Sequence, residues 1–256
     1  YRCGEHGVVV PAPRAAERLA SGLWEPLCPR CEAEVTVEPA SPVVAPSPTS
    51  TYGVTKRDQE ALLHLLLPPR GVGVVSLRLQ NVYGPGQSLR NPYTGILSLF
   101  SGRFLAGQGV RIFEDGLESR DFVYVDDAVE AFVRAGGVTP PSGGAVIDVG
   151  SGVATPVLDA ALALADRYGA PRSAVAVTGE YRVGDVRHAV ADTRVARELL
   201  GLPDPTPLAR GLDALADWVL GSQRPASRLE GALDEMAASG LLGRARARAA
   251  GGDLAS

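Results

Sequence analysis

The residues whose types and spacing could do chemistry begin with a tyrosine and a lysine four positions apart, Tyr52 and Lys56. They stand at the start of residues 52–67, where apolar residues recur at helical spacing, so both side chains are expected on one helix face. A phenol is a poor base near neutral pH, but a neighbouring ammonium favours the phenolate and lowers the pKa. Such a pair can take a proton from a hydroxyl group while a hydride leaves the same carbon. The spacing alone is a weak signal, because it also occurs on exposed helix faces.

A second candidate set is Cys3-x-x-His6 followed by Cys28-x-x-Cys31, which includes every cysteine of the chain. Paired ligands two residues apart suit a tetrahedral zinc ion, because each pair can hold one edge of the metal from a tight turn. Residues 1–47 contain few apolar side chains and would need such a staple to become ordered. We therefore expect a structural zinc with four protein ligands and no open position for catalysis. The alternative is three ordinary buried thiols and an exposed histidine.

The elements that must position these residues alternate between strands and helices. This alternation predicts an α/β fold with a mostly parallel sheet covered on both faces. Residues 1–47 are predicted to form an irregular insertion, and residues 223–256 an Ala/Arg/Gly-rich, mobile tail with one helix at 227–236. The predicted strands are 74–79, 111–113 and 145–149, and the other predicted helices are 52–67, 93–101, 126–134, 156–168, 193–200 and 208–220.

Composition narrows the classes of partner. A chain of 256 residues with 45% apolar residues can bury a real core. The net charge of −4 comes from 25 basic and 29 acidic residues that are interspersed, which argues against binding to nucleic acid or to an anionic membrane. No apolar run approaches the roughly 20 residues that span a bilayer, and the first residues do not form a signal peptide. We expect a cytoplasmic protein with a small-molecule partner.

Four sequence blocks carry a family resemblance: residues 50–56 (STYGVTK), 77–86 (LRLQNVYGPG), 119–127 (SRDFVYVDD) and 181–188 (YRVGDVRH). In order and spacing they resemble the NAD-dependent epimerase/dehydratase family of extended short-chain dehydrogenases/reductases. The resemblance covers residues 48–219. It implies a Rossmann-like, doubly wound parallel sheet, of which only part is present, and a small C-terminal substrate-binding domain.

The resemblance implies roles in cofactor binding for four residues. Tyr52 would act as general base and acid, and Lys56 would hold the hydroxyls of the nicotinamide ribose of NAD. Leu79 and Val82 would lie against the cofactor. The family's glycine-rich turn for the NAD pyrophosphate and its catalytic serine or threonine are not in this sequence. Because Met236 is the sole methionine, we expect that an upstream segment was removed or not included.

The resemblance also implies a site for a nucleotide-diphosphate sugar. Asn81, at the carboxyl end of a strand, would donate its side-chain amide to the diphosphate, at the edge where parallel sheets bind ligands. Arg120 and Arg182 would clamp the same group with their planar donors. The alternative for each arginine is a surface ion pair, for example between Arg182 and Asp185. Two residues of the following loop are expected to face the substrate, Gln87 and Arg90.

The resulting functional hypothesis is an NAD-dependent nucleotide-sugar 4-epimerase, in which hydride leaves and returns at C4 of the sugar through a ketone. A nucleotide-sugar 4,6-dehydratase and a non-catalytic sugar-nucleotide binding subunit are the alternatives. The Cys/His insertion resembles a subgroup described as dTDP-rhamnose 4-epimerase-like. The family also implies a homodimer through the apolar outer face of residues 52–67. The expected domains are residues 1–47, 48–150, 151–222 and 223–256.

Overall fold

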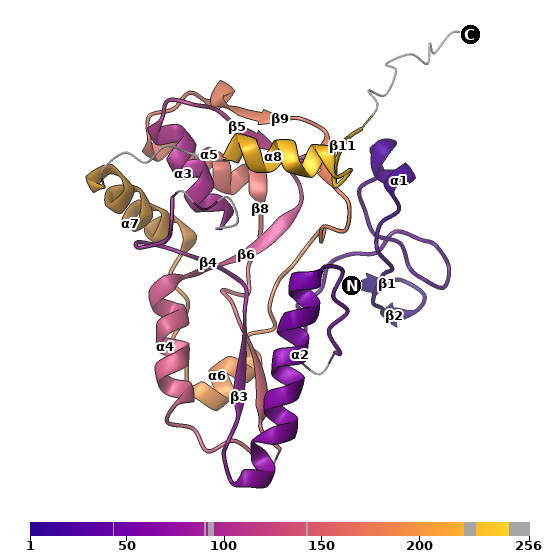
Figure 1. The fold of residues 1–256 in the computed structure, drawn as a ribbon, viewed down its shortest axis with the longest axis vertical. Coiled ribbons are helices and arrows are strands. Elements are labelled where there is room, and N and C mark those ends of the chain that lie inside the picture. The colour runs from indigo at the N-terminus through magenta and orange to yellow at the C-terminus, as the bar shows by residue number, and fades with distance from the viewer. Residues whose placement is uncertain (43, 90, 92–94, 142, 223–228, 246–256) are drawn as a thin grey trace.

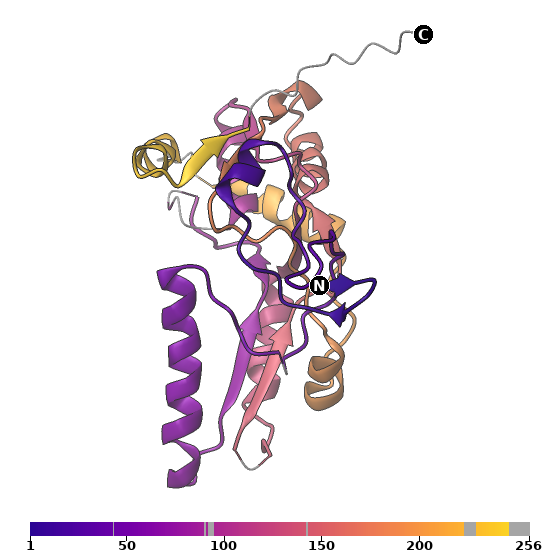
Figure 2. The same cartoon turned by 90° about the vertical axis from the view of Figure 1, so that its right-hand side faces the viewer.

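The computed structural model describes residues 1–42, 44–89, 91, 95–141, 143–222 and 229–245 (Figures 1 and 2). Two packing units can be followed in the ribbon, one around a parallel strand layer and one around three helices. An N-terminal segment with short strands and one short helix lies beside them. Among the described residues, no helix combines the length and apolar character needed to cross a membrane.

The lower unit in Figure 1 is a parallel strand layer with helices on two sides. β3 pairs in parallel with β7, and β4 pairs in parallel with β6. A hydrogen bond of 2.9 Å from Gln80 N to Val149 O extends the β3–β7 ladder, and Gln80 joins β3 to β4 along the chain. Helices α4 and α6 pack on one face through buried apolar side chains. The elements are α2 (Thr51–Leu66), β3 (Val75–Leu79), β4 (Asn81–Tyr83), β6 (Ser119–Tyr124), α4 (Val125–Ala135), β7 (Ala145–Val149) and α6 (Arg194–Leu200).

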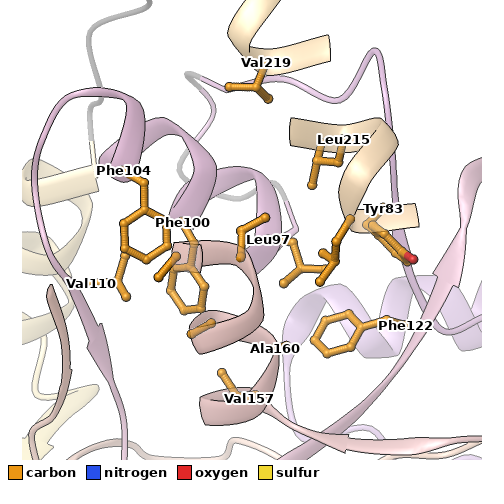
Figure 3. Packing of buried hydrophobic residues seen from close by; sticks show 14 of the residues in the cluster. Tyr83, Leu97, Phe100, Phe104, Val110, Phe122, Val157, Ala160, Leu215 and Val219 are labelled. Atoms are coloured by element: carbon orange, nitrogen blue, oxygen red, sulfur yellow. The ribbon is translucent and has the colours of Figure 1, made fainter. Parts of the chain in front are cut away.

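The upper unit holds the larger hydrophobic core (Figure 3). Phe100 and Phe104 of α3 pack with Val157 and Ala160 of α5, and Leu215 comes from α7. β5 pairs in parallel with β9, and β8 pairs antiparallel with β6. The elements of this unit are α3 (Ile96–Leu105), β5 (Val110–Ile112), β8 (Ala154–Pro156), α5 (Val157–Arg167), β9 (Val175–Val177) and α7 (Leu208–Gly221).

The helix that carries Tyr52 and Lys56 is α2. Ser50 caps its N-terminus, because the Ser50 hydroxyl accepts a hydrogen bond of 3.1 Å from Gly53 N. The 3₁₀ turn Pro68–Arg70 follows, and Gly71 then adopts a left-handed φ of 76° that ends the helical path. No residue of α2 is buried, so its apolar side chains face solvent. Figure 2 shows α2 as a separate layer beside the strands.

The two ends of the described chain contribute small antiparallel pairs. β1 (Arg2–Cys3) pairs with β2 (Gly7–Val8), and α1 (Ala16–Ala20) follows. Near the other end, α8 (Leu229–Ala238) leads into β11 (Leu242–Arg244). β11 pairs antiparallel with β10 (Glu180–Arg182). The described part of the tail is therefore attached to the fold, which corrects the prediction of a mobile appendage over residues 229–245.

The sequence predicted the α/β class correctly, and the predicted long helices and strands are present. The prediction that the strand at 74–79 is buried was wrong, because no residue of β3 is buried. The helix expected at 93–101 instead begins at Ile96 and runs to Leu105, after Gly95 in an extended conformation. The predicted boundary at residue 150 does not separate the packing units in space. α3 belongs to the upper core, whereas α6, from the later segment, packs on β7 of the lower unit.

Candidate functional site

A cavity of about 750 Å³ collects the candidate residues from many parts of the chain. Tyr52, Asn81, Arg120 and Arg182 all line it, although they come from α2, β4, β6 and β10. This volume falls within the range typical of small-molecule sites. The rest of the lining mixes apolar and charged side chains: Gly95, Ile96, Leu99, Phe100, Arg103, Arg111, Ile112, Phe113, Glu114, Glu118, Val157, Asp185 and Met236.

The Tyr52 and Lys56 side chains lie together on one face of α2, as their spacing predicts. Lys56 Nζ stands 5.6 Å from the centroid of the Tyr52 ring, and it lies 3.5 Å from Gln59 Oε1. Tyr52 is 72% exposed, so its ring is largely open to solvent. This geometry places an ammonium beside a phenol whose hydroxyl is free to meet a ligand.

The two candidate arginines differ in their protein partners. Arg120 Nη1 donates to the backbone oxygens of Ser119 and Arg187 at 2.9 and 3.1 Å, and Nη2 pairs with Asp185 Oδ1 at 3.3 Å. Arg182 Nε is buried and has no hydrogen-bond partner among the described residues. The ion pair considered for Arg182 with Asp185 is therefore made by Arg120 instead, and Arg182 retains a donor for a ligand.

The other residues predicted to contact the cofactor or the substrate differ in exposure and in hydrogen-bond partners. Leu79 ends β3 with 39% exposure, while Val82 packs against the lower core. The Gln87 amide donates to Val82 O at 3.2 Å and accepts a hydrogen bond from the Ser98 hydroxyl. Gln87 thus fixes the loop beside the cavity and is not among its lining residues in the described chain. Arg90 lies outside the described residues.

A buried ion network supports the cavity wall, and no motif in the sequence signalled it. The Arg187 side chain is 1% exposed and bonds Glu114 at 2.9 Å and Asp115 at 2.7 Å. Arg14, from the N-terminal segment, pairs with Glu114 at 2.7 Å and donates to Asp185 O at 3.0 Å. The network therefore connects the N-terminal segment to two residues that line the cavity, Glu114 and Asp185.

Glu118 is a second lining residue that sequence reasoning missed. Its Oε2 is buried without a hydrogen-bond partner, and the nearest cation is Arg187 Nη1, 3.9 Å away. Burial, reinforced by the negative charge of Glu114, raises the pKa of the Glu118 carboxyl to about 7. An unsatisfied carboxyl at the edge of a cavity is a candidate ligand contact.

The four predicted metal ligands also come together. Cys3 Sγ lies 3.6 Å from His6 Nδ1 and 3.6 Å from Cys31 Sγ, and Cys28 Sγ lies 3.6 Å from His6 Nδ1. All four ligand atoms lie within 4.8 Å of one another. Sulfurs about 2.3 Å from a tetrahedral zinc would stand about 3.8 Å apart, so the donor set has the dimensions of such a site. The hydrogen bond with His6 lowers the pKa of the Cys3 thiol to about 6, which favours the thiolate.

Comparison with known proteins identifies the family. The sequence model described as the NAD dependent epimerase/dehydratase family matches residues 30–146. The chain belongs to this family. A dTDP-L-rhamnose 4-epimerase of Burkholderia thailandensis is 39% identical over 83% of this chain and 56% of its own length. A UDP-glucose 4-epimerase of Mycolicibacterium smegmatis is 37% identical over 68% of this chain and 54% of its own length. The chain thus spans about half the length of these family members.

Solved structures of the family share this fold. MoeE5 in complex with UDP-glucuronic acid and NAD has a TM-score of 0.64 and 34% identity over 73% of this chain and 61% of its own. The UDP-glucose 4-epimerase of Thermotoga maritima with UDP-glucose also has a TM-score of 0.64, at 31% identity over 73% and 59%. A dTDP-glucose 4,6-dehydratase of Bacillus anthracis, at 16% identity, matches in fold alone.

Proposed function

We propose that this chain provides the nucleotide-sugar site and the catalytic pair of an NAD-dependent nucleotide-sugar 4-epimerase. The observation that carries the proposal is one cavity lined by Tyr52, Asn81, Arg120 and Arg182. A phenol, an amide and two guanidinium groups are the donors needed for a sugar hydroxyl at one end and a diphosphate at the other.

In this proposal the diphosphate is held from two sides. Arg182 turns its unpartnered Nε toward the anion, and Arg120, fixed by two backbone oxygens and Asp185, presents its remaining donor capacity. The Asn81 side chain, at the start of β4, adds an amide donor. A sugar anchored by its diphosphate would then extend toward the Tyr52 phenolate oxygen, which takes a proton from the C4 hydroxyl and later returns it.

The residues present suit only the nicotinamide-ribose end of NAD. When bound, NAD accepts a hydride from C4 of the sugar and returns it to the other face. Lys56 is free to donate to ribose hydroxyls, and Leu79 offers exposed apolar surface at the carboxyl end of β3. Val82, at the edge of the lower core, supports that surface. Because the glycine-rich turn is not in this sequence, calorimetry should find much weaker than micromolar NAD affinity for this chain alone.

The two alternative functions differ from the epimerase in different ways: the dehydratase forms another product, and the binding subunit has no turnover. A 4,6-dehydratase would release water, whereas the relatives at 39% and 37% identity are named 4-epimerases. A binding subunit without turnover is favoured by one observation, the wide exposure of Tyr52 and of the α2 face around it. The intact Tyr52, Lys56 and Asn81 set favours the epimerase over that subunit.

The deciding assay supplies an NAD-binding segment, encoded by in-frame codons upstream of Tyr1 or taken from the Burkholderia relative. NMR should show inversion at C4 of UDP-glucose or dTDP-L-rhamnose with no change of mass. Tyr52→Phe should abolish turnover and keep sugar-nucleotide affinity within a few-fold, because the hydroxyl moves a proton. Arg57→Ala, an exposed change on the same helix, is the control. Loss of water would indicate the dehydratase, and tight binding without turnover would indicate the subunit.

We also propose that Cys3, His6, Cys28 and Cys31 hold one structural zinc ion. Three sulfurs and one imidazole nitrogen within 4.8 Å of one another form a closed tetrahedral donor set. Elemental analysis should give about one zinc per chain, and chelation should deprotect residues 1–40 in hydrogen exchange while α2 stays unchanged. Stoichiometry near zero, together with unaltered stability of Cys28→Ser and Cys31→Ser, would contradict the site.

We further propose a homodimer through α2, in the cytoplasm, where free thiols persist. Leu62, Leu65 and Leu66 are 54%, 69% and 46% exposed on this helix, which is a large apolar surface for one helix. Analytical ultracentrifugation should show a dimer, and Leu65→Glu should give a monomer, whereas Asp58→Ala on the same helix should not. A monomeric parent would contradict the dimer.

A further inference from the structure

The C-terminal segment of the described chain, α8 with β11, reaches the cavity although its sequence lies beyond the helical core. Met236 of α8 lines the cavity together with Tyr52, Arg120 and Arg182. In both ribbon views α8 lies beyond the N-terminal end of α2, where Tyr52 stands (Figures 1 and 2). One wall of the cavity thus depends on this segment.

Backbone pairing attaches the segment to the strand that carries Arg182. β11 pairs with β10 in the register Tyr181↔Gly243 and Arg182↔Leu242. The ladder extends at both ends, because Val183 N donates to Leu241 O at 3.0 Å and Ala245 N donates to Gly179 O at 2.8 Å. The position of β11 therefore restrains the backbone on which the Arg182 guanidinium is mounted.

Two local features fix the geometry of the segment. The chain turns between α8 and β11 at Gly240, which has a φ of 71°, and Leu241 N donates to Met236 O at 2.9 Å. At the pairing itself, a Cβ on Gly243 would come within 2.5 Å of Cζ in the Tyr181 ring. Only glycine at 243 lets β11 lie against this buried ring, so the docking position is specific.

The described contacts of α8 with the rest of the chain are few. Within the described residues α8 makes its main contacts with β11, and Asp234, Glu235 and Ala237 are exposed. Met236 is half-buried and is the residue of α8 that lines the cavity. A short strand and one apolar side chain form a weak attachment, which a ligand in contact with Met236 would strengthen.

We propose that the segment 229–245 is a specificity element, in which Met236 packs against the nucleoside of the bound nucleotide sugar and β11 sets the position of Arg182. This rests on the proposed function, which places the sugar at Tyr52 and the diphosphate at Arg120 and Arg182. Leu99, Phe100, Ile112, Phe113 and Met236 form an apolar part of the lining, beside charged residues such as Arg103 and Arg111. A polarisable thioether in such a wall suits the face of a planar base.

The experiment compares binding of UDP, dTDP and inorganic pyrophosphate by calorimetry to this chain and four variants. Met236→Ala should weaken UDP and dTDP about ten-fold and leave pyrophosphate unchanged, because only the nucleoside loses a contact. Gly243→Val, which blocks the docking of β11, and a chain ending at Ser222 should weaken all three ligands about ten-fold or more. Glu235→Ala, on the exposed side of α8, should bind like the parent.

Each outcome separates the two proposals. A parent that binds none of these ligands, nor UDP-glucose, contradicts the proposed function and this inference together. A parent that binds them, with affinity unchanged by Gly243→Val and by the shortened chain, contradicts the inference alone. If the shortened chain fails to fold by circular dichroism, the ratio of UDP to pyrophosphate affinity in Met236→Ala still decides. An unchanged ratio overturns the role of Met236.

Discussion

The charged wall of the cavity and the helix that carries the Tyr52 and Lys56 pair are held in opposite ways. Arg187, behind the wall, is 1% exposed and is bonded to carboxylates from distant parts of the chain. No residue of α2 is buried, and Tyr52 is 72% exposed. The charged wall is held by side-chain bonds between distant parts of the chain, whereas Tyr52 and Lys56 contact each other within α2, which the Glu60–Arg78 ion pair at 2.7 Å joins to β3. The following predictions test that contrast, from the largest effect to the smallest.

Arg187→Met should produce the largest loss of stability. It leaves half-buried Asp115 without its cation and removes one of the two cations that bond buried Glu114, which keeps Arg14. Breaking a buried ion pair typically costs about 3–5 kcal/mol of unfolding free energy. Urea denaturation followed by circular dichroism measures this. The control is Arg194→Met, since Arg194 is 81% exposed in its pair with Asp192 and should contribute less than about 1 kcal/mol. Equal losses of stability in the two variants would show that the buried network stabilises the wall no more than an exposed ion pair does.

Glu118→Gln should remove a pH dependence of stability. The pKa of the Glu118 carboxyl is raised to about 7 in the folded chain by burial, with the charge of Glu114 adding to the rise. A raised acid pKa favours the fold most below its unfolded value, about 4.5, and this contribution is lost as pH rises through about 7. The shift corresponds to on the order of 3 kcal/mol. Between pH 4.5 and 7.5 the urea midpoint of unfolding should fall less with rising pH in Glu118→Gln than in the parent. Parallel profiles would contradict the raised pKa of Glu118.

Arg182→Leu should affect binding rather than folding. Because its Nε has no partner in the described chain, the loss should leave the unfolding midpoint nearly unchanged. Sugar-nucleotide affinity should fall about 10- to 100-fold, since a hydrogen bond from a charged donor contributes about 1.5–3 kcal/mol. Arg172→Leu, in an exposed 3₁₀ turn, should change neither quantity. A large stability loss with unchanged affinity would make Arg182 a structural residue.

Tyr52→Phe should have the smallest effect on this chain. The side chain is exposed, and Lys56 Nζ lies 5.6 Å from its ring centroid, so the change in unfolding free energy should be within about 0.5 kcal/mol. Thermal unfolding of the two proteins side by side measures it. A destabilisation comparable to that of Arg187→Met would mean that α2 is anchored through Tyr52, and the contrast between the two regions would disappear.

The sequence predicts most strongly where the signal is local. Helix α2 was predicted because apolar residues recur at helical spacing over residues 52–67, and the structure adds the Ser50 cap and the turn at Pro68 that bound it. The clustering of Cys3, His6, Cys28 and Cys31 was predicted because paired spacing limits how such ligands can meet. The paired strands β3 and β7 were predicted, at 74–79 and 145–149, from their β-branched and apolar runs.

The parts that were missed depend on partners far along the chain. β11 has three residues and pairs through backbone hydrogen bonds, so its side chains carry no period to detect. The role of Arg187 follows from Glu114 and Asp115, which are separated from it by 73 and 72 positions. In the sequence Glu118 cannot be distinguished from an exposed acidic residue, because its burial depends on the folded structure. Such features belong to the assembled fold rather than to any stretch of sequence.

The interleaving of the two packing units has a consequence for how a ligand enters. The chain passes from β3 and β4 to the upper helix α3, returns for α4 and β7, rises again for α5, and descends once more for α6. Bending one unit against the other would have to distort several of these crossings at once, so hinge-like opening is disfavoured. The cavity is therefore expected to keep its width when a ligand enters.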